Sequence, residues 1–284
     1  MNEFQILLHN FGLLTSKLTN AETGEFVGYG VSSAQMPLYL ALVVLTVIIG
    51  YFLGCFNTAL ILSRRKYHED IRAYGSGNAG MTNVLRTYGK KAAAITLIGD
   101  MLKAALAVFV GAILTGELGA YAAGFFCLIG HCFPAFFGFK GGKGVAVTAA
   151  VILCLNPLVF LILLIFFVLT VLATKFLSLA SIISVMVYPI LLNRLYSFTH
   201  GGLPESGSAA VFSILSAAVV VFLHRENIKR LMEGTEHKVS LRKTDRHPKD
   251  EPAEIPASEE YEPAPRSEKP NPNTSKKKQK RAKK

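Results

Sequence analysis

Long apolar runs separated by short polar connections constrain this chain more than any other feature of its sequence. The first run, residues 37–62, has no charged residue and is long enough to cross the hydrocarbon core of a bilayer as a helix. Hydrophobic residues make up 51% of the 284 residues, and the mean hydropathy is +0.39. Because a soluble domain of this length requires more polar surface, the pattern indicates a polytopic helical membrane protein.

Further apolar segments follow, and together they predict an all-α fold of about seven transmembrane helices. The dipeptide Asn156-Pro157 separates the fourth segment from the fifth and leaves the fourth unusually short. The predicted spans are about 37–62, 92–114, 119–137, 144–155, 157–173, 176–192 and 209–223.

Basic residues near the span ends predict the orientation of the chain. They gather at 64–91, 140–143, 175 and 225–230, which seven spans place on one face. The opposite connections hold Glu117 and Glu205, with Arg194 as an exception. We therefore expect the N-terminus outside and the C-terminus in the cytoplasm. The net charge of +11 then reflects topology and anionic lipid rather than nucleic acid.

Three regions follow from these patterns. In the N-terminal extension, 1–36, apolar residues from Phe4 to Leu18 recur at helical spacing, which indicates an interfacial helix or else a loosely ordered tail. Residues 37–240 form the transmembrane domain. Residues 241–284 are rich in Pro, Glu, Ser and Lys, which predicts a disordered basic cytoplasmic tail. Its basic end either contacts anionic lipid or remains solvated.

Four cysteines, at positions 55, 127, 132 and 154, lie in or beside apolar runs. Their spacing is not that of a metal site or a disulfide framework, so we interpret them as small buried hydrophobic residues. We expect no cleavable signal peptide, because the first residues lack a basic region followed by an apolar stretch and a small-residue cleavage site.

The first polar motif, GSGNAGMTNVLRTYGKK, lies between two apolar segments on the predicted cytoplasmic face. Glycines such as Gly77 and Gly80 permit positive φ and close approach by a ligand, and successive N–H groups can bind an anion. The loop leads to a helix N-terminus, but it lacks the spacing of a nucleotide-binding loop. The motif predicts an anion site, with a flexible connector as the alternative. Its other candidate ligand-binding side chains are Ser76, Asn78, Thr82, Asn83 and Arg86.

A second motif, GHCFPAFFGFKGGKGVAVT, again combines glycines, cations and the start of a helix. Gly141, Gly142 and Lys143, with Lys140 nearby, predict a second phosphate site. A lysine that sets topology is the alternative for Lys143. His131, at the end of the preceding span, is either a structural hydrogen-bonding residue or a catalytic one.

Two further polar groups lie at the ends of spans. Ser178 and Ser181 are three residues apart at a helix start, so they either cap the helix or line a cavity. In HRENIKRLMEGTEHK, His224, Asn227 and Arg230 share one helical face just after the last span. A basic stop-transfer segment would explain the cations there but not His224 and Asn227.

One pair of opposite charges lies inside a predicted span. Asp100 and Lys103 are one helical turn apart and can neutralise each other. Charges in hydrocarbon usually face the interior of a bundle, so the pair is either a polar tie between helices or a catalytic element.

These motifs, in the order GSGNAGMTNVLRTYGKK, DMLK, GHCFPAFFGFKGGKGVAVT, SLAS and HRENIKRLMEGTEHK, resemble the bacterial acyl-phosphate-dependent glycerol-3-phosphate acyltransferases across about 37–238. The resemblance implies acyl transfer from acyl phosphate to the sn-1 hydroxyl of glycerol 3-phosphate, giving 1-acylglycerol 3-phosphate and phosphate, the first acylation in phospholipid synthesis. It implies a multi-pass protein of the bacterial plasma membrane, with its active site on the cytoplasmic face and a functional link to the enzyme that makes acyl phosphate. Because acyl phosphate is already activated, no metal or nucleotide cofactor is expected.

The resemblance also implies residue roles. The loop from Ser76 to Asn83 would hold the acyl-phosphate head group, and Arg86 and Lys143, with Ser76, would bind the phosphate of glycerol 3-phosphate. His224 and Asn227 would orient the glycerol. The H-x4-D pattern of the other acyltransferase class is absent from the sequence. The resemblance implies that a substrate phosphate accepts the proton, and His224 and His131 are the alternatives.

Two other functional classes stay open on the residues alone. A transporter for a phosphorylated solute fits the spans and anion-binding loops, although the spans show no evident internal repeat. A scaffold would leave the ordered glycine–lysine motifs unexplained.

Overall fold

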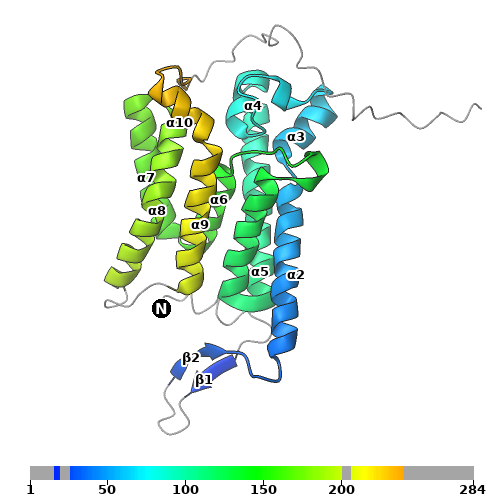
Figure 1. Cartoon of the computed structure of the whole chain (residues 1–284), viewed down its shortest axis with the longest axis vertical. Coiled ribbons are helices and arrows are strands. Elements are labelled where there is room, and N and C mark those ends of the chain that lie inside the picture. Colours follow the sequence, from blue (N-terminus) through cyan, green and yellow to red (C-terminus); the bar gives the residue numbers. More distant parts are fainter. Residues whose placement is uncertain (1–15, 20–25, 200–205, 240–284) are drawn as a thin grey trace, which may run out of the picture. The chain divides into compact units, whose positions relative to one another are not determined.

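The computed structural model describes residues 16–19, 26–199 and 206–239 (Figure 1). Strand β1 (Ser16–Thr19) pairs antiparallel with β2 (Phe26–Gly30). The predicted interfacial helix is therefore wrong at Leu18, because the segment FVGYG, rich in residues that favour strands, supplies a pairing partner. The rest of that helix, in 1–15, and the predicted tail from 241 lie outside the described residues.

The first apolar run forms two helices rather than one. Helix α2 (Met36–Cys55) ends before Phe56, and α3 (Thr58–Leu62) begins after Asn57, whose Oδ1 accepts a hydrogen bond from Leu60 N at 3.1 Å. A π-helical turn (Ser63–Tyr67) and a 3-10 turn (Ile71–Ala73) then lead to the first glycine-rich motif.

Helix α5 (Lys90–Cys132) contains two predicted spans and folds back on itself. Thr115 and Gly116 leave the helical conformation, with φ of 68° at Gly116. The backbones of Gly111 and Gly119 lie against each other, so that a Cβ on either would collide with the carbonyl oxygen of the other. The halves of α5 before and after Gly116 therefore run side by side, and small residues permit their close approach.

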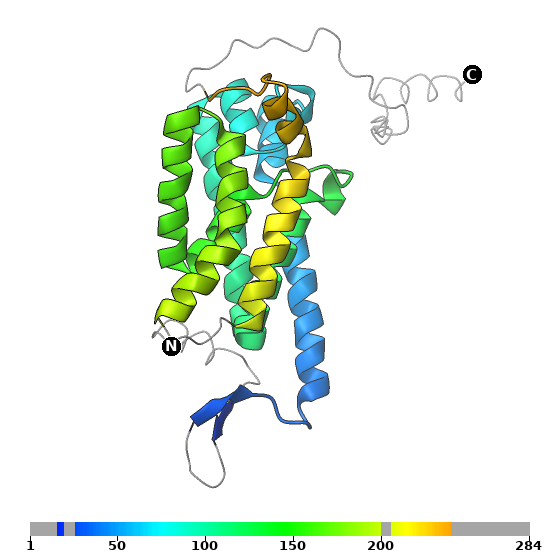
Figure 2. The same ribbon diagram turned by 60° about the vertical axis from the view of Figure 1, so that its left-hand side comes forward.

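Helix α5 is central to the bundle because it contacts α2, α6 and α9. Helices α7, α8 and α9 lie side by side in both views (Figures 1 and 2). The buried core between the helices contains many small residues, including Ala104, Ala107, Ala120 and Ala150, together with the buried Tyr188. The remaining helices are α4 (Met81–Tyr88), α6 (Val145–Leu155), α7 (Pro157–Thr174), α8 (Leu177–Thr199), α9 (Gly207–Leu223) and α10 (Arg225–Met232).

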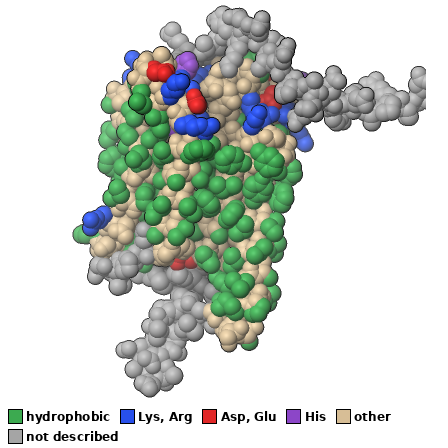
Figure 3. Space-filling model, in the orientation of Figure 1, with side chains coloured by type: hydrophobic (Ala, Val, Ile, Leu, Met, Phe, Trp, Pro, Cys, Tyr) green, Lys and Arg blue, Asp and Glu red, His purple; other side chains and the backbone are tan. Residues whose placement is uncertain are grey.

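Four helical stretches of the described residues are long and apolar enough to cross a membrane, and they are Met36–Tyr67, Lys90–Phe137, Pro157–Thr174 and Leu177–Thr199. Helices α9 and α10, bent by 57° at their junction, make a fifth if they count as one span. Helix α6 is apolar but has 11 residues, and among the described helices it is not one of those long enough to cross a membrane. Hydrophobic side chains cover most of the visible face, and most Lys and Arg side chains gather at the end where α4 and α10 lie (Figure 3).

Candidate active site

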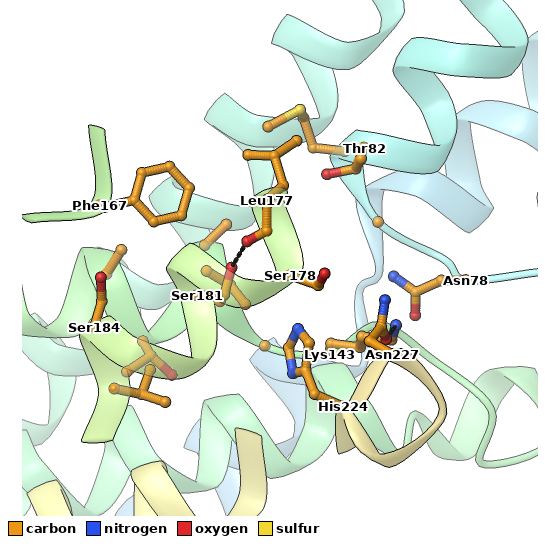
Figure 4. Close-up of a pocket in the computed structure, with 18 of the residues that line it drawn as sticks. Asn78, Thr82, Lys143, Phe167, Leu177, Ser178, Ser181, Ser184, His224 and Asn227 are labelled. Atoms are coloured by element: carbon orange, nitrogen blue, oxygen red, sulfur yellow. Dashed lines mark hydrogen bonds between the residues drawn. The ribbon is translucent and has the colours of Figure 1, made fainter. Parts of the chain in front are cut away.

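A cavity of about 390 Å³ lies where the polar motifs of the sequence meet. Figure 4 shows Lys143, Ser178, His224 and Asn227 gathered together, with Phe167 on the other side. Part of the cavity lining consists of apolar side chains from α5, α6, α7 and α8, and we call this part the apolar arm. The residues that line this arm include Leu97, Met101, Val145, Ala149, Ile152, Phe160, Leu163, Leu164 and Val185.

The cavity brings together all five predicted catalytic residues, which are Ser76, Arg86, Lys143, His224 and Asn227. The other predicted residues that line it are Asn78, Gly80, Thr82, Asn83, Asp100, His131, Ser178 and Ser181. The predicted residues outside its lining are Gly77, Lys103, Lys140, Gly141 and Gly142.

The first glycine-rich loop is held in shape by Asn83, whose side chain is 1% exposed. Its Oδ1 accepts a hydrogen bond from Ser76 N at 3.0 Å, and its Nδ2 donates to the carbonyls of Ile71 and Tyr74 at 3.1 and 2.9 Å. Gly75 has φ of 56°, and a Cβ there would collide with Asn83 Oδ1. Because both amide hydrogens of Asn83 are used, this residue shapes the loop rather than offering free donors to a ligand.

The second glycine-rich loop docks on the end of α5 and positions Lys143. The N–H groups of Gly141 and Gly142 donate to the carbonyls of Cys132 and His131 at 3.0 and 3.1 Å. A Cβ at Gly142 would collide with His131 Nε2. Because the N–H groups of Gly141 and Gly142 already have backbone partners, these two glycines serve the packing of the loop, and a phosphate here would bind to Lys143 instead.

The charged pair inside α5 binds the break between α2 and α3. Lys103 Nζ lies 2.9 Å from Asp100 Oδ1 and donates to the carbonyls of Gly54 and Phe56 at 3.1 and 3.0 Å. Asp100 Oδ1 accepts from Thr58 Oγ1 at 3.0 Å. The cation thus lies at the C-terminal end of α2 and the anion at the N-terminus of α3, as helix dipoles favour. This arrangement supports the interpretation of the pair as a polar tie.

His131 joins the same cluster and is 3% exposed. Its Nδ1 lies 2.9 Å from Lys103 Nζ and 3.5 Å from Asn57 Nδ2. Because an ammonium group can only donate, Nδ1 is an acceptor and the neutral ring carries its proton on Nε2. These contacts support the structural interpretation of His131 over the catalytic one.

Ser178 and Ser181 both line the cavity, which is the second of the two interpretations of these serines. Ser181 Oγ donates to the carbonyl of Leu177 within its own helix at 2.8 Å (Figure 4). Ser178 Oγ donates to Glu236 Oε1 at 2.7 Å. Ser178 therefore connects α8 to the segment that follows α10.

Glu236 is a site residue that the sequence patterns did not identify. Its side chain is 6% exposed, and besides Ser178 it accepts hydrogen bonds from Asn227 Nδ2 at 2.7 Å and Arg230 Nε at 2.8 Å. Lys143 Nζ donates to Asn227 Oδ1. In the sequence, Glu236 is one of three glutamates in the basic segment 224–238, and nothing in the pattern distinguishes it from Glu226 and Glu233.

The electrostatics of the cavity favour an anionic ligand. Burial lowers the pKa of Lys143 to about 8, and the nearby Arg230 guanidinium contributes to the same lowering. Burial also lowers the pKa of Arg86. Burial would raise the pKa of Glu236, but the hydrogen bonds from Ser178, Asn227 and Arg230 hold it below its ordinary value. Since burial disfavours the charges of Arg86 and Lys143, a bound anion would stabilise both.

His224 has a fixed orientation in the cavity. Its Nδ1 lies 2.7 Å from the carbonyl oxygen of Val220. A carbonyl can only accept, so Nδ1 carries the proton and Nε2 of the neutral ring is free to accept a hydrogen bond. Among the described residues, no group of three or more His, Cys, Asp or Glu side chains is arranged to hold a metal ion.

The family model described as Glycerol-3-phosphate acyltransferase matches residues 44–234. The glycerol-3-phosphate acyltransferase of Thermoanaerobacter pseudethanolicus is 44% identical over 196 residues, which cover 69% of this chain and 95% of that protein. The glycerol-3-phosphate acyltransferase of Clostridioides difficile is 37% identical over 206 residues, with 70% and 97% covered.

The fold is similar to solved structures of PlsY (YgiH), an integral membrane glycerol 3-phosphate acyltransferase. Its glycerol 3-phosphate form is 32% identical, with a TM-score of 0.63, over 70% of this chain and 96% of that one. Its lysophosphatidic acid form is 31% identical, with a TM-score of 0.60 over the same shares.

Proposed function

The chain belongs to the glycerol-3-phosphate acyltransferase family, and on that premise we propose that it transfers a fatty acyl group from acyl phosphate to the sn-1 hydroxyl of glycerol 3-phosphate. The products are 1-acylglycerol 3-phosphate and inorganic phosphate. The observation that carries the proposal is a single cavity that combines Arg86, Lys143 and Arg230 with an apolar arm. Both substrates carry phosphate, and one of them carries a fatty chain, so the cavity matches the pair.

The two substrates occupy different parts of the cavity in this proposal. Arg86 and Lys143, with Ser76, bind the phosphate of glycerol 3-phosphate, and Asn227 orients its glycerol part. Burial strengthens both cations as anion ligands, because their charge is otherwise poorly solvated. The loop from Ser76 to Thr82 takes the phosphate of the acyl donor, and N–H groups there stabilise charge on the attacked carbonyl oxygen.

The acyl chain occupies the apolar arm between α5, α6, α7 and α8. Residues such as Ala149, Ile152 and Phe160 line this arm, and each methylene that leaves water there contributes about 0.8 kcal/mol to binding. The arm holds the chain while the polar part of the cavity holds both phosphates. Positioning two reactants in this way supplies a large part of an enzyme's rate enhancement.

In the reaction, the sn-1 oxygen attacks the acyl carbonyl carbon and the bond from that carbon to the phosphate oxygen breaks. The phosphate leaves with the bonding electron pair and accepts the hydroxyl proton. His224 accepts a hydrogen bond from the hydroxyl through Nε2 and so orients it, because the bond from Nδ1 to Val220 fixes the ring.

We also propose seven membrane spans, with the N-terminus outside and the active site on the cytoplasmic face of a bacterial plasma membrane. The reversal of α5 at Thr115 and Gly116 supports two spans in that helix. The gathering of most Lys and Arg side chains at the end of the helices where α4 and α10 lie supports the orientation (Figure 3). The acyl donor would come from a separate enzyme that makes acyl phosphate.

The test uses purified protein in detergent with palmitoyl phosphate and labelled glycerol 3-phosphate. Labelled lysophosphatidate is the expected product, with much less from palmitoyl-CoA or palmitoyl acyl carrier protein. Lys143→Ala serves as the inactive control. If no donor gives product and the protein in liposomes takes up glycerol 3-phosphate, the chain is a transporter and the proposal fails.

A further inference from the structure

A carboxylate lies where the proposed function places phosphate. Arg86, Lys143, Arg230 and Glu236 line the same cavity, and Glu236 accepts a hydrogen bond from Arg230 Nε at 2.8 Å. The side chain of Glu236 is 6% exposed, so its carboxylate is inside the protein and not at the solvent-exposed edge of the cavity. Glu236 therefore reduces the positive charge of the cavity while no substrate is bound.

The donors that Glu236 uses are donors that suit a phosphate. Ser178 Oγ and Asn227 Nδ2 each lie 2.7 Å from Oε1, and Arg230 Nε lies 2.8 Å from Oε2. Carboxylate and phosphate oxygens accept hydrogen bonds from the same hydroxyl, amide and guanidinium groups. A phosphate that binds beside Lys143 and uses these donors has to share them with Glu236 or displace its carboxylate.

The backbone keeps Glu236 close to these donors. The N–H groups of Thr235 and Glu236 both donate to the carbonyl of Arg230, at 2.8 and 3.1 Å. Further along, Val239 N donates to the carbonyl of Lys175 at 2.7 Å. The segment is thus fixed to α10 at one end and to the turn between α7 and α8 at the other, so the carboxylate stays within reach of the cations.

We propose that Glu236 is an internal competitor of phosphate, which weakens the affinity of Arg86, Lys143 and Arg230 for a phosphate group so that the product 1-acylglycerol 3-phosphate can leave. This inference deepens the proposed function and rests on it. In that function, the catalytic cycle ends with the phosphate group of 1-acylglycerol 3-phosphate held by these half-buried cations. Without an anion among them, that phosphate would be retained and would block the next turnover.

If the Glu236 carboxylate only held α10 in place, its removal would not increase the affinity for phosphate. Its loss would loosen Asn227 and Arg230, and phosphate would bind less tightly or as before. A competing carboxylate predicts tighter phosphate binding when its charge is removed. The direction of the change in phosphate affinity therefore separates the two roles.

The experiment measures binding of inorganic phosphate to the full chain in detergent by isothermal titration calorimetry at pH 7, without acyl donor. The variants are Glu236→Gln, which removes the charge and keeps the shape, and Glu233→Gln as the matched control. Glu233 lies three residues earlier, its side chain is 51% exposed, and its basic partner, Lys229, is 4.0 Å away. Melting temperatures without phosphate show whether each variant is folded.

We expect Glu236→Gln to bind phosphate about tenfold more tightly than the wild type, and Glu233→Gln to bind it unchanged. In the acyl-transfer assay, Glu236→Gln should be inhibited by correspondingly lower phosphate concentrations. A folded Glu236→Gln whose phosphate affinity is unchanged or lower overturns the inference while leaving the proposed function intact. A wild-type protein that binds no phosphate overturns both, because the anion site itself would then be absent.

Glu236→Asp provides a second variant if Glu236→Gln does not fold. It keeps the charge and shortens the side chain by one methylene, which draws the carboxylate back from Ser178 and Asn227. We expect phosphate affinity above that of the wild type. Unchanged or weaker binding by Glu236→Asp overturns the inference in that case.

Discussion

Asn57 donates a hydrogen bond from Nδ2 to the carbonyl of Ala79 at 3.2 Å, and so connects the break in the first apolar run to the glycine-rich loop. The same side chain caps α3, because its Oδ1 accepts from Leu60 N. Asn57 is completely buried. One amide therefore fixes both the end of the first long helix and a loop that lines the cavity.

Replacing Asn57 by Ala should destabilise the protein by about 2 kcal/mol, because it leaves Leu60 N and the Ala79 carbonyl without a buried partner. Unfolding by heat or denaturant in detergent measures the change. Asn193→Ala, at an exposed position of α8, is the matched control and should have little effect. Equal stability of the two variants would contradict the role assigned to Asn57.

Close backbone packing inside α5 leads to a second stability prediction. Gly111→Ala should destabilise the protein by about 1–3 kcal/mol, because the new Cβ meets the carbonyl oxygen of Gly119. Gly207→Ala is the control, since a Cβ at that position would point into open space and alanine favours a helix. Thermal unfolding of both variants checks the prediction, and an unaffected Gly111→Ala would argue against the reversal of α5.

The sequence predicted an all-helical membrane fold, because long apolar runs are visible in it directly. It also predicted that the polar motifs meet, because they all lie at the ends of these runs. It did not predict the break at Asn57, since one neutral amide barely changes the hydropathy of an apolar run. Nor did it predict the role of Asn83, because spacing shows that an amide is present but not that all its hydrogens are used inside the loop.

The use of the N–H groups of Gly141 and Gly142 could not be predicted for a related reason. A glycine-rich loop with a lysine has the composition of an anion site, but its N–H groups bind an anion only if no backbone carbonyl takes them first. Glu236 was missed because its donors, Ser178 and Asn227, come from α8 and α10. Only the folded chain brings them together.

The lowered pKa of Lys143 predicts how the affinity for glycerol 3-phosphate depends on pH. Burial and Arg230 lower its pKa to about 8, so the side chain is charged below that pH and loses its charge above it. A phosphate monoester becomes a dianion above about pH 6. The KM for glycerol 3-phosphate should therefore be lowest between about pH 6 and 8 and should rise above pH 8.

Lys143→Arg is the matched variant, because a guanidinium stays charged throughout this range. Its KM for glycerol 3-phosphate should not rise between about pH 8 and 10, as steady-state kinetics across this range would show. In the absence of substrate, the free energy of unfolding of the wild-type protein should increase above pH 8, although the affinity for substrate decreases there. The unfolded lysine binds its proton up to about pH 10.5, so the folded state gains stability as pH rises above 8. The same rise in KM in both proteins would exclude Lys143 as its cause.

The apolar arm predicts a dependence on acyl-chain length. Ala149 lines the arm, so Ala149→Phe should shorten the space available to the chain by about two methylenes, worth about 1.6 kcal/mol or roughly tenfold in kcat/KM for a C16 donor. A C8 donor should react almost as well as before. Leu153→Phe, which is on the same helix but outside the cavity lining, should not change the ratio of C16 to C8 activity. Equal ratios in all three proteins would place the acyl chain elsewhere.

Replacing His224 by Ala shows whether this residue orients the hydroxyl of glycerol 3-phosphate or accepts its proton. If the leaving phosphate takes the proton and His224 orients the hydroxyl, His224→Ala should lower kcat by roughly 10²-fold while the shape of the pH–rate profile stays the same. If His224 is the base, its loss should remove the acidic limb of the profile. His131→Ala is the comparison, because His131 contacts Lys103 in the buried cluster, so this variant should lose stability. Profiles of kcat and kcat/KM from about pH 5 to 9, with melting temperatures for each variant, separate these outcomes.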